Sequence, residues 1–237
     1  MTESVTSLDP DASDLLTELV TIGVGRAAAA LSELVGERVE LTVPRVHLVP
    51  LLCPLDGARS PDGLLTDGVS TVVIQDFQGT VRGRASLAFL RSSALALGNL
   101  LSDSEVTTTH VDLEVGGILL EVGNIVLNAV LGSLSNEAAL TLEYSLPHLF
   151  SDGPVLPRLL PQSAGEEHLL IADVEFVVRN RNIAGTLAIV FAGGCVDLLL
   201  SRAARRWSPD GREEVPLLRM TRRNGFHDIP TGQLPHR

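Results

Sequence analysis

The sequence predicts an α+β fold that is internally duplicated, with long helices packed on a largely antiparallel β-sheet. The segment that starts at Glu18 returns at Glu121 with an offset of 103 residues, and residues 83–90 return at 185–192 with an offset of 102. Each copy has a helix–strand–strand–strand–helix pattern with short links between strands, which favours antiparallel pairing. Two copies in one chain indicate pseudo-twofold symmetry.

The first repeat, residues 11–102, opens with Ala and Leu at helical spacing, which predicts a helix over 12–35. Residues 38–44 then alternate apolar and polar, and we expect Pro44 to end this strand. Pro and Gly between 50 and 68 indicate a loop. The last elements are two strands joined by a Gln78-Gly79 turn and a helix, at 69–78, 81–90 and 91–102.

The second repeat, residues 112–206, follows the same order. Its helix is predicted at 112–136, with Thr109 or Asp112 as the N-cap. A strand should follow and stop at Pro147. The remaining predictions are a loop at 151–166, strands at 168–179 and 183–192, and a helix at 194–206.

The two ends of the chain read as extensions of this domain. Residues 1–10 are polar and acidic and are predicted to be disordered, and the low density of apolar residues in 207–237 predicts a flexible tail. Eight arginines against four acids make the segment 202–237 basic. The chain is 45% hydrophobic, which excludes disorder over most of its length.

Charge and cysteine content narrow the classes of function. The first 201 residues hold ten arginines against 25 acids, which argues against a nucleic-acid partner and suits one that presents a basic residue. Cys53 and Cys195 lie in apolar surroundings and read as free thiols in a reducing cytoplasm. The N-terminus is unlike a secretory signal, and no apolar run is long enough to suggest insertion into a membrane, so we expect a cytoplasmic protein. The histidines are scattered and predict no metal site.

Polar residues in the second repeat helix point to a site, because the rest of that helix is apolar almost all round. At 100° per residue, Asn124 lies about 60° and Asn128 about 20° from Glu121, so the three share one stripe. Leu119, Val122, Ile125 and Val126 should pack on the other face. Solvent-facing positions of an amphipathic helix are the plain alternative, but the Glu recurs in the first repeat at Glu18.

This arrangement resembles the CheC/CheX/FliY phosphatase family, and CheC most closely. The family pattern is Asp or Ser, three residues, Glu, two residues, Asn, and a proline after 22 more. Glu121, Asn124 and Pro147 match it, while Gly117 stands at the leading position. The resemblance spans about residues 14–204 and extends to the sequence around both repeat helices.

The first repeat matches the pattern only in part. Asp14, Glu18 and Pro44 fit, but Thr21 replaces the Asn and Gly25 stands where Asn128 does. The resemblance therefore implies a degenerate second site, since Thr is shorter than Asn and has no amide.

The resemblance implies a mechanism as well. The substrate would be the aspartyl phosphate of a CheY-like response regulator, whose own Mg²⁺ and lysine hold the phosphoryl group. Asn124 would orient the attacking water, and Glu121 would pair with the regulator's lysine. No cofactor or metal is then expected in this chain.

A non-enzymatic role remains the alternative. A duplicated domain of this kind could be an adapter that binds a CheD-like receptor deamidase or a response regulator, or it could be part of a flagellar switch. Nothing in the sequence resembles the extra C-terminal domain of the switch proteins, which weakens the last version.

Overall fold

A computed structural model describes residues 10–50, 70–102, 110–151, 156–159, 168–178 and 181–207. The helices are α1 (Pro10–Val35), α2 (Arg91–Leu101), α3 (Leu113–Glu137), α4 (Leu156–Leu159) and α5 (Cys195–Trp207). The strands are β1 (Val39–Pro50), β2 (Ser70–Gly79), β3 (Gly83–Leu90), β4 (Leu142–Tyr144), β5 (His148–Ser151), β6 (His168–Val178) and β7 (Arg181–Phe191). The predictions for residues 1–9, for the segment 51–69 with Cys53, and for the tail from 208 fall outside these ranges.

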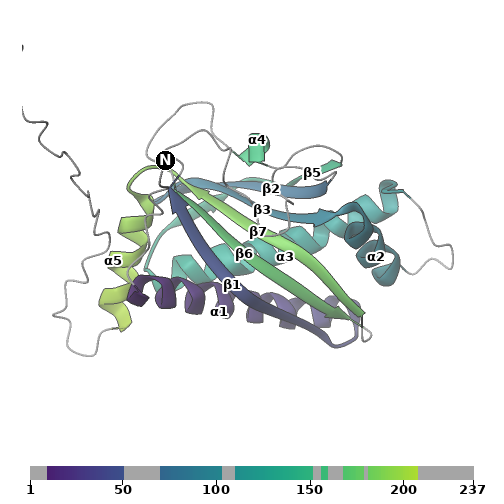
Figure 1. The fold of residues 1–237 in the computed structure, drawn as a ribbon, viewed down its shortest axis with the longest axis horizontal. Coiled ribbons are helices and arrows are strands. Elements are labelled where there is room, and N and C mark those ends of the chain that lie inside the picture. Colours follow the sequence, from purple (N-terminus) through teal and green to yellow (C-terminus); the bar gives the residue numbers. More distant parts are fainter. Residues whose placement is uncertain are drawn as a thin grey trace, which may run out of the picture.

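The described strands form one antiparallel sheet whose order confirms the duplication (Figure 1). The order is β1-β6-β7-β3-β2-β4, with β5 beside β4 on β2. It is a palindrome in which β1 corresponds to β4 and β5, β2 to β6, and β3 to β7. The strand that follows each long helix pairs with the hairpin of the other repeat, so the two halves exchange strands.

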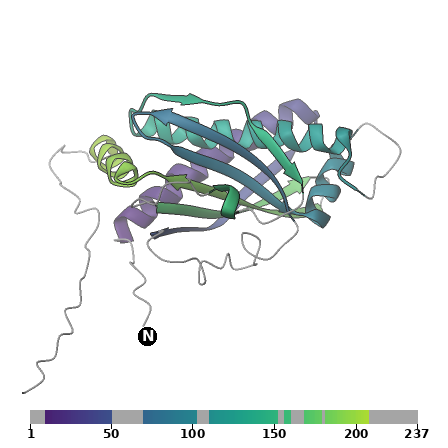
Figure 2. The ribbon, with the colours of Figure 1, turned by 90° about the horizontal axis from the view of Figure 1, so that it is seen from above.

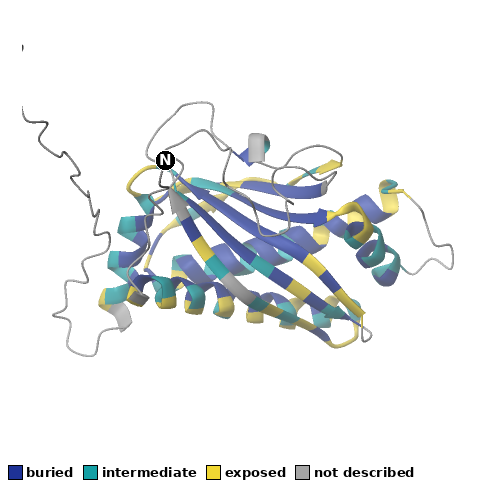
Figure 3. Ribbon diagram, in the orientation of Figure 1, coloured by how far each residue is buried: buried dark blue, intermediate teal, exposed yellow. Residues whose placement is uncertain are grey.

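The two long helices lie on the same side of the sheet and cross each other there (Figure 2). One large core joins them to the inward face of the strands, where Phe89, Phe176 and Phe191 are fully buried. The side of α1 that faces away from the core is exposed to solvent (Figure 3), whereas most residues of α3 are buried or half-buried. A smaller apolar cluster lies on the opposite face of the sheet, where Leu159 of α4 packs.

Most helix and strand boundaries agree with the sequence predictions within about two residues, as expected where periodicity is strong. Asp112 is the N-cap of α3, and its Oδ1 accepts a hydrogen bond from the Val115 backbone N–H at 2.9 Å. The turn predicted at Gln78-Gly79 lies slightly later, at residues 80–82, because β2 runs to Gly79 and β3 begins at Gly83. Gly79 itself has φ +135°. A Cβ there would lie 2.2 Å from the Thr141 carbonyl oxygen, so the position requires glycine.

The prediction that Pro44 ends its strand is wrong. β1 continues to Pro50, and its pairing with β6 shifts register between Thr42 and Arg45. β1 is an edge strand of the described sheet, where a proline at a bulge removes no essential ladder hydrogen bond. The sequence pattern alone does not distinguish such a bulge from a strand end.

The second repeat departs from prediction in the matching region. The stretch expected as one strand up to Pro147 forms only the short β4, and pairing with β2 resumes after the proline as β5. The short helix α4 lies inside the segment 151–166, which was predicted to be loop. Both repeats therefore interrupt the strand near the motif proline, to different extents.

By length and hydropathy, α1 and α3 would each qualify as a membrane span. Both instead pack on the sheet, and 50% of the most apolar window of α3 is buried inside the domain. Core helices of soluble proteins share this composition, and packing accounts for it here.

Candidate functional site

The polar stripe predicted on α3 runs along the edge of the core and is partly exposed. Leu119, Val122 and Val126 are fully buried on the other face of the helix, and Ile125 is half-buried. Glu121 is exposed, while Asn124 and Asn128 are half-buried. A helix held firmly on one side thus presents a carboxylate and a carboxamide one turn apart on the other.

A chain of hydrogen bonds connects the stripe to the sheet. Asn128 Nδ2 donates to Asn124 Oδ1 at 2.7 Å, and Gln75 Nε2 of β2 donates to Asn128 Oδ1 at 3.1 Å. Gln75 Nε2 also donates to the Ser145 carbonyl oxygen at 3.0 Å. Gln75 is 2% exposed, so this chain begins inside the domain and ends at the candidate site.

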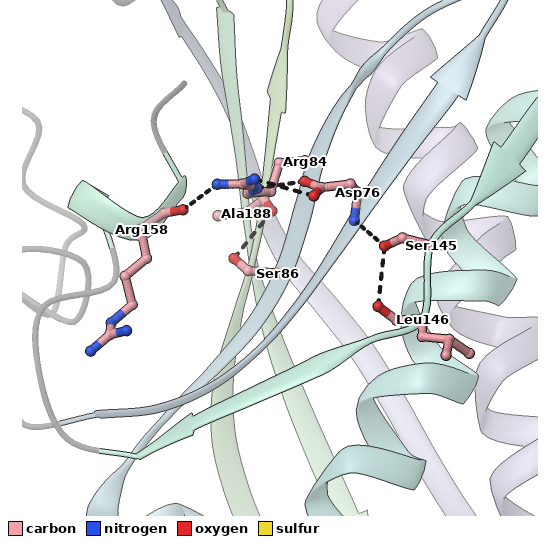
Figure 4. Close-up of polar contacts among 7 residues, drawn as sticks. All are labelled: Asp76, Arg84, Ser86, Ser145, Leu146, Arg158 and Ala188. Carbon is pink, nitrogen blue, oxygen red and sulfur yellow. Dashed lines mark hydrogen bonds and ion pairs between the residues drawn. The ribbon is translucent and has the colours of Figure 1, made fainter. Parts of the chain in front are cut away.

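The segment between β4 and β5 borders the site and is fixed to β2. The Asp76 backbone N–H donates to Ser145 Oγ (Figure 4). The Ser145 N–H in turn donates to the Asp76 carbonyl oxygen. On the other side of β2, the Asp76 carboxylate pairs with the Arg84 guanidinium. These bonds place Leu146 in a rigid frame, although its side chain is 81% exposed.

Two strongly exposed leucines belong to the segments that carry or border the polar stripe. Leu113, at the first position of α3, is 96% exposed and lies about 20° from Asn124 around the helix. Leu146 follows Ser145, whose carbonyl oxygen shares the Gln75 amide with Asn128. Exposed leucines beside a polar stripe can supply apolar contact area to a protein partner.

Glu121 and Gly117 complete this surface. Within the part of the chain that the structure describes, the Glu121 carboxylate has no hydrogen bond or ion pair to another side chain. A Cβ added at Gly117 would meet no atom within 4 Å, so the leading motif position has room for a side chain. The motif proline Pro147 is half-buried between β4 and β5.

The first-repeat positions also reach the surface. Asp14, Glu18 and Thr21 are all exposed on α1, and a Cβ at Gly25 would stand in open space. No hydrogen bond among the described residues joins Thr21 to the sheet. Pro44 lies in β1, at the register shift described above.

Two serines at corresponding positions of the repeat helices, Ser32 and Ser135, have structural partners. Ser32 Oγ donates to the Ala28 carbonyl oxygen and accepts from the Val39 N–H, and Ser135 Oγ donates to the Leu140 carbonyl oxygen. Each serine thus holds the end of its helix to the chain that follows it. Burial raises the pKa of Tyr144, and its hydrogen bond with Ser135 opposes that shift.

Within the described ranges, no group of three or more His, Cys, Asp or Glu side chains could hold a metal ion, and Cys195 is a half-buried free thiol.

Solved structures share this architecture. Thermotoga maritima FliY aligns with a TM-score of 0.65 and 18% identity, over 84% of this chain and 98% of that one. This chain has the same fold as FliY. The FliY-like fold confirms, at the level of architecture, the resemblance that the motifs indicated. No protein-family model matches the sequence.

Two Helicobacter pylori structures share the FliY-like fold as well. A chain of the FliM–SpeE complex aligns with a TM-score of 0.59 and 11% identity, over 84% of this chain and 98% of that one. A chain of the FliG–FliM complex aligns with a TM-score of 0.54 and 12% identity, over 81% and 99%. At these sequence identities the similarity establishes the fold only, and any catalytic or binding function must be argued from the residues of the site.

Sequence reasoning identified the stripe on α3 but missed its support. Gln75 lies 53 residues before Asn128, in the other repeat, so no local pattern connects them. One signal was available: Gln75 occupies the same face of β2 as Val73 and Phe77, where alternation demands an apolar residue. A polar side chain at a core position of a strand needs a partner.

Proposed function

We propose that this protein is a phosphatase that hydrolyses the aspartyl phosphate of a CheY-like response regulator. Asn124 would orient the attacking water, and Glu121 would pair with the lysine of the regulator. The Mg²⁺ that the reaction needs would come with the regulator, and this chain would add no cofactor. Such a protein would act in chemotaxis signalling in the cytoplasm.

One observation carries this proposal: the exposed Glu121 carboxylate lies one turn from a tethered Asn124 on a rigid helix. Phosphoryl transfer depends on position and charge stabilisation more than on covalent chemistry. A regulator that already holds its phosphoryl group on a metal and a lysine requires only a docked amide that places water in line. Glu121 and Asn124 have the chemistry and spacing for that task.

The surface around the stripe supports docking on a protein. Leu113, at the start of α3, and Leu146, next to Ser145, add exposed apolar area. The acidic body, with 25 acids against ten arginines in residues 1–201, favours encounter with a partner whose docking face carries a lysine. The same partner could meet Glu18 on α1, where Thr21 offers no amide for the water.

The test is loss of phosphate from a phosphorylated CheY-like protein. Wild type should accelerate it, and Asn124→Ala should reduce kcat about 100-fold or more, because the water loses its orientation. Glu121→Ala should mainly raise KM, and Thr21→Ala should leave the rate unchanged. Asn136→Ala, an exposed position near the end of the same helix, is the matched control.

Two results would overturn the proposal. If wild type does not accelerate phosphate loss, the protein is not this kind of phosphatase. If Asn124→Ala equals wild type while wild type is active, the active residues lie elsewhere.

The second candidate is a non-catalytic adapter for a CheD-like deamidase or a response regulator. It is favoured by the two FliM-containing complexes above, in which a chain of the same fold belongs to an assembly of proteins. An adapter would bind its partner without accelerating phosphate loss, and Asn124→Ala would leave its affinity unchanged. Measuring affinity and turnover on the same variants separates the two roles.

A further inference from the structure

A buried glutamine lies behind the candidate site and leaves one of its own atoms unpaired. Gln75 is 2% exposed, and its Oε1 is buried and has no hydrogen-bond partner within the described residues. Both protons of its Nε2 are used, toward the Ser145 carbonyl oxygen and toward Asn128 Oδ1. A buried acceptor without a partner costs about 1–3 kcal/mol, so the retention of Gln75 in the core requires an explanation.

The backbone fixes which way each amide points. A carbonyl oxygen can only accept, so the Gln75 atom that faces the Ser145 oxygen must be Nε2. The same nitrogen also donates to Asn128, so Asn128 must accept that bond with its Oδ1. The Nδ2 of Asn128 then points toward Asn124. Asn124 must then accept with Oδ1, and its Nδ2 donors are turned away from Asn128.

We infer that Asn128 and, from the opposite repeat, Gln75 are positioning residues, which set the rotamer and the amide orientation of Asn124. The inference rests on the proposed function for its consequence in catalysis. The Nδ2 protons of Asn124 are then already oriented toward the water or the phosphoryl oxygens, and no rotation of the amide is needed first. Preorganisation of this kind lowers the entropic cost of reaching the reacting geometry.

The degenerate repeat lacks the same set of residues. Thr21 stands in place of Asn124, and Gly25 in place of Asn128. β6 takes the place of β2, and its inward-facing positions are apolar: Leu170, Ala172, Val174 and Phe176. The apolar positions of β6 show that the sheet can pack without a buried glutamine on this face. Among the described residues, the hydrogen-bonded series Gln75–Asn128–Asn124 occurs only at the site that has Asn124.

The first arm of the test separates positioning from packing. Gln75→Met keeps the length of the side chain and removes the donor, and it also removes the unpaired acceptor. We expect its melting temperature to stay close to that of wild type, kcat to fall about 10- to 100-fold, and KM to stay constant. Gln78→Met is the matched control, because Gln78 lies on the same strand but is exposed and bonds Glu143.

The second arm reads the orientation directly and does not need turnover. Side-chain amide NMR of Asn124, assigned by comparison with Asn124→Ala, should show one fixed rotamer in wild type. Gln75→Met and Asn128→Leu should each produce rotamer averaging, while Gln78→Met should not.

The outcomes are distinct. An Asn124 amide that averages in wild type, or stays fixed in Gln75→Met, overturns the inference whatever the enzyme does. A kcat of Gln75→Met equal to that of wild type, or matched by Gln78→Met, overturns it as well. If wild type shows no phosphatase activity, the proposed function fails, and the NMR arm still decides whether Gln75 and Asn128 set Asn124.

Discussion

Gly23 of α1 packs directly on the backbone of α3 at Val130. A Cβ added at Gly23 would lie 2.6 Å from Val130 Cα and 3.2 Å from the Ala129 carbonyl oxygen, so the helices could not keep their present separation. This contact joins the first repeat helix to the helix that carries the candidate site.

Replacement of Gly23 by alanine should therefore destabilise the protein. Overpacking costs about 1–3 kcal/mol, which exceeds the gain of about 1 kcal/mol that alanine brings to a helix. Gly25→Ala is the matched control, since its Cβ would stand in open space, and it should raise the free energy of unfolding. Chemical denaturation of both variants measures the difference, and equal stabilities would contradict the close packing.

Leu146→Ser should weaken docking of the proposed substrate, a response regulator. Full burial of a leucine is worth about 1.5–3 kcal/mol, so KM should rise about tenfold or more while kcat stays constant. Leu113→Ser should act in the same direction. Leu34→Ser provides the control, because the Leu34 side chain is exposed as well, at 57%, but lies on α1. A fall in kcat without a change in KM would show that Leu146 acts on chemistry instead of docking.

Glu121→Gln should raise KM severalfold and reduce its dependence on salt. An exposed ion pair contributes up to about 1 kcal/mol and is screened as ionic strength rises. For wild type, KM should therefore increase with sodium chloride, and for Glu121→Gln the increase should be smaller. The control is Glu18→Gln at the corresponding position of α1. Parallel salt curves for wild type and Glu121→Gln would argue against a lysine contact.

Thr21→Asn alone should not restore activity to an Asn124→Ala protein. The new amide would lack the partner that Asn128 gives to Asn124, because Gly25 has no side chain. Adding Gly25→Asn, which the open space at this position permits, should bring back a fraction of the turnover. Full recovery with Thr21→Asn alone would mean that the amide needs no support.

The sequence was informative where one residue pattern decides the outcome. Periodicity located α1 and α3, and the recurrence of Glu18 at Glu121 indicated the duplication. It failed where spatial context decides: Pro44 occupies a bulge in an edge strand, and α4 forms in a segment rich in turn residues. Gln75 could not be assigned to the site because its partner belongs to the other repeat.

The exchange of strands between the repeats has a consequence for how the protein can evolve. β1 is paired only with β6, and β4 and β5 only with β2, within the described sheet. If one repeat were expressed as a separate polypeptide, the strand after its long helix would have no pairing partner. The outer strand of its hairpin would also lose the strand that pairs with it in the intact sheet. Deletion of the first repeat would therefore leave strands of the second unpaired and remove Gln75 from beside Asn128, even if Thr21 takes no part in any reaction.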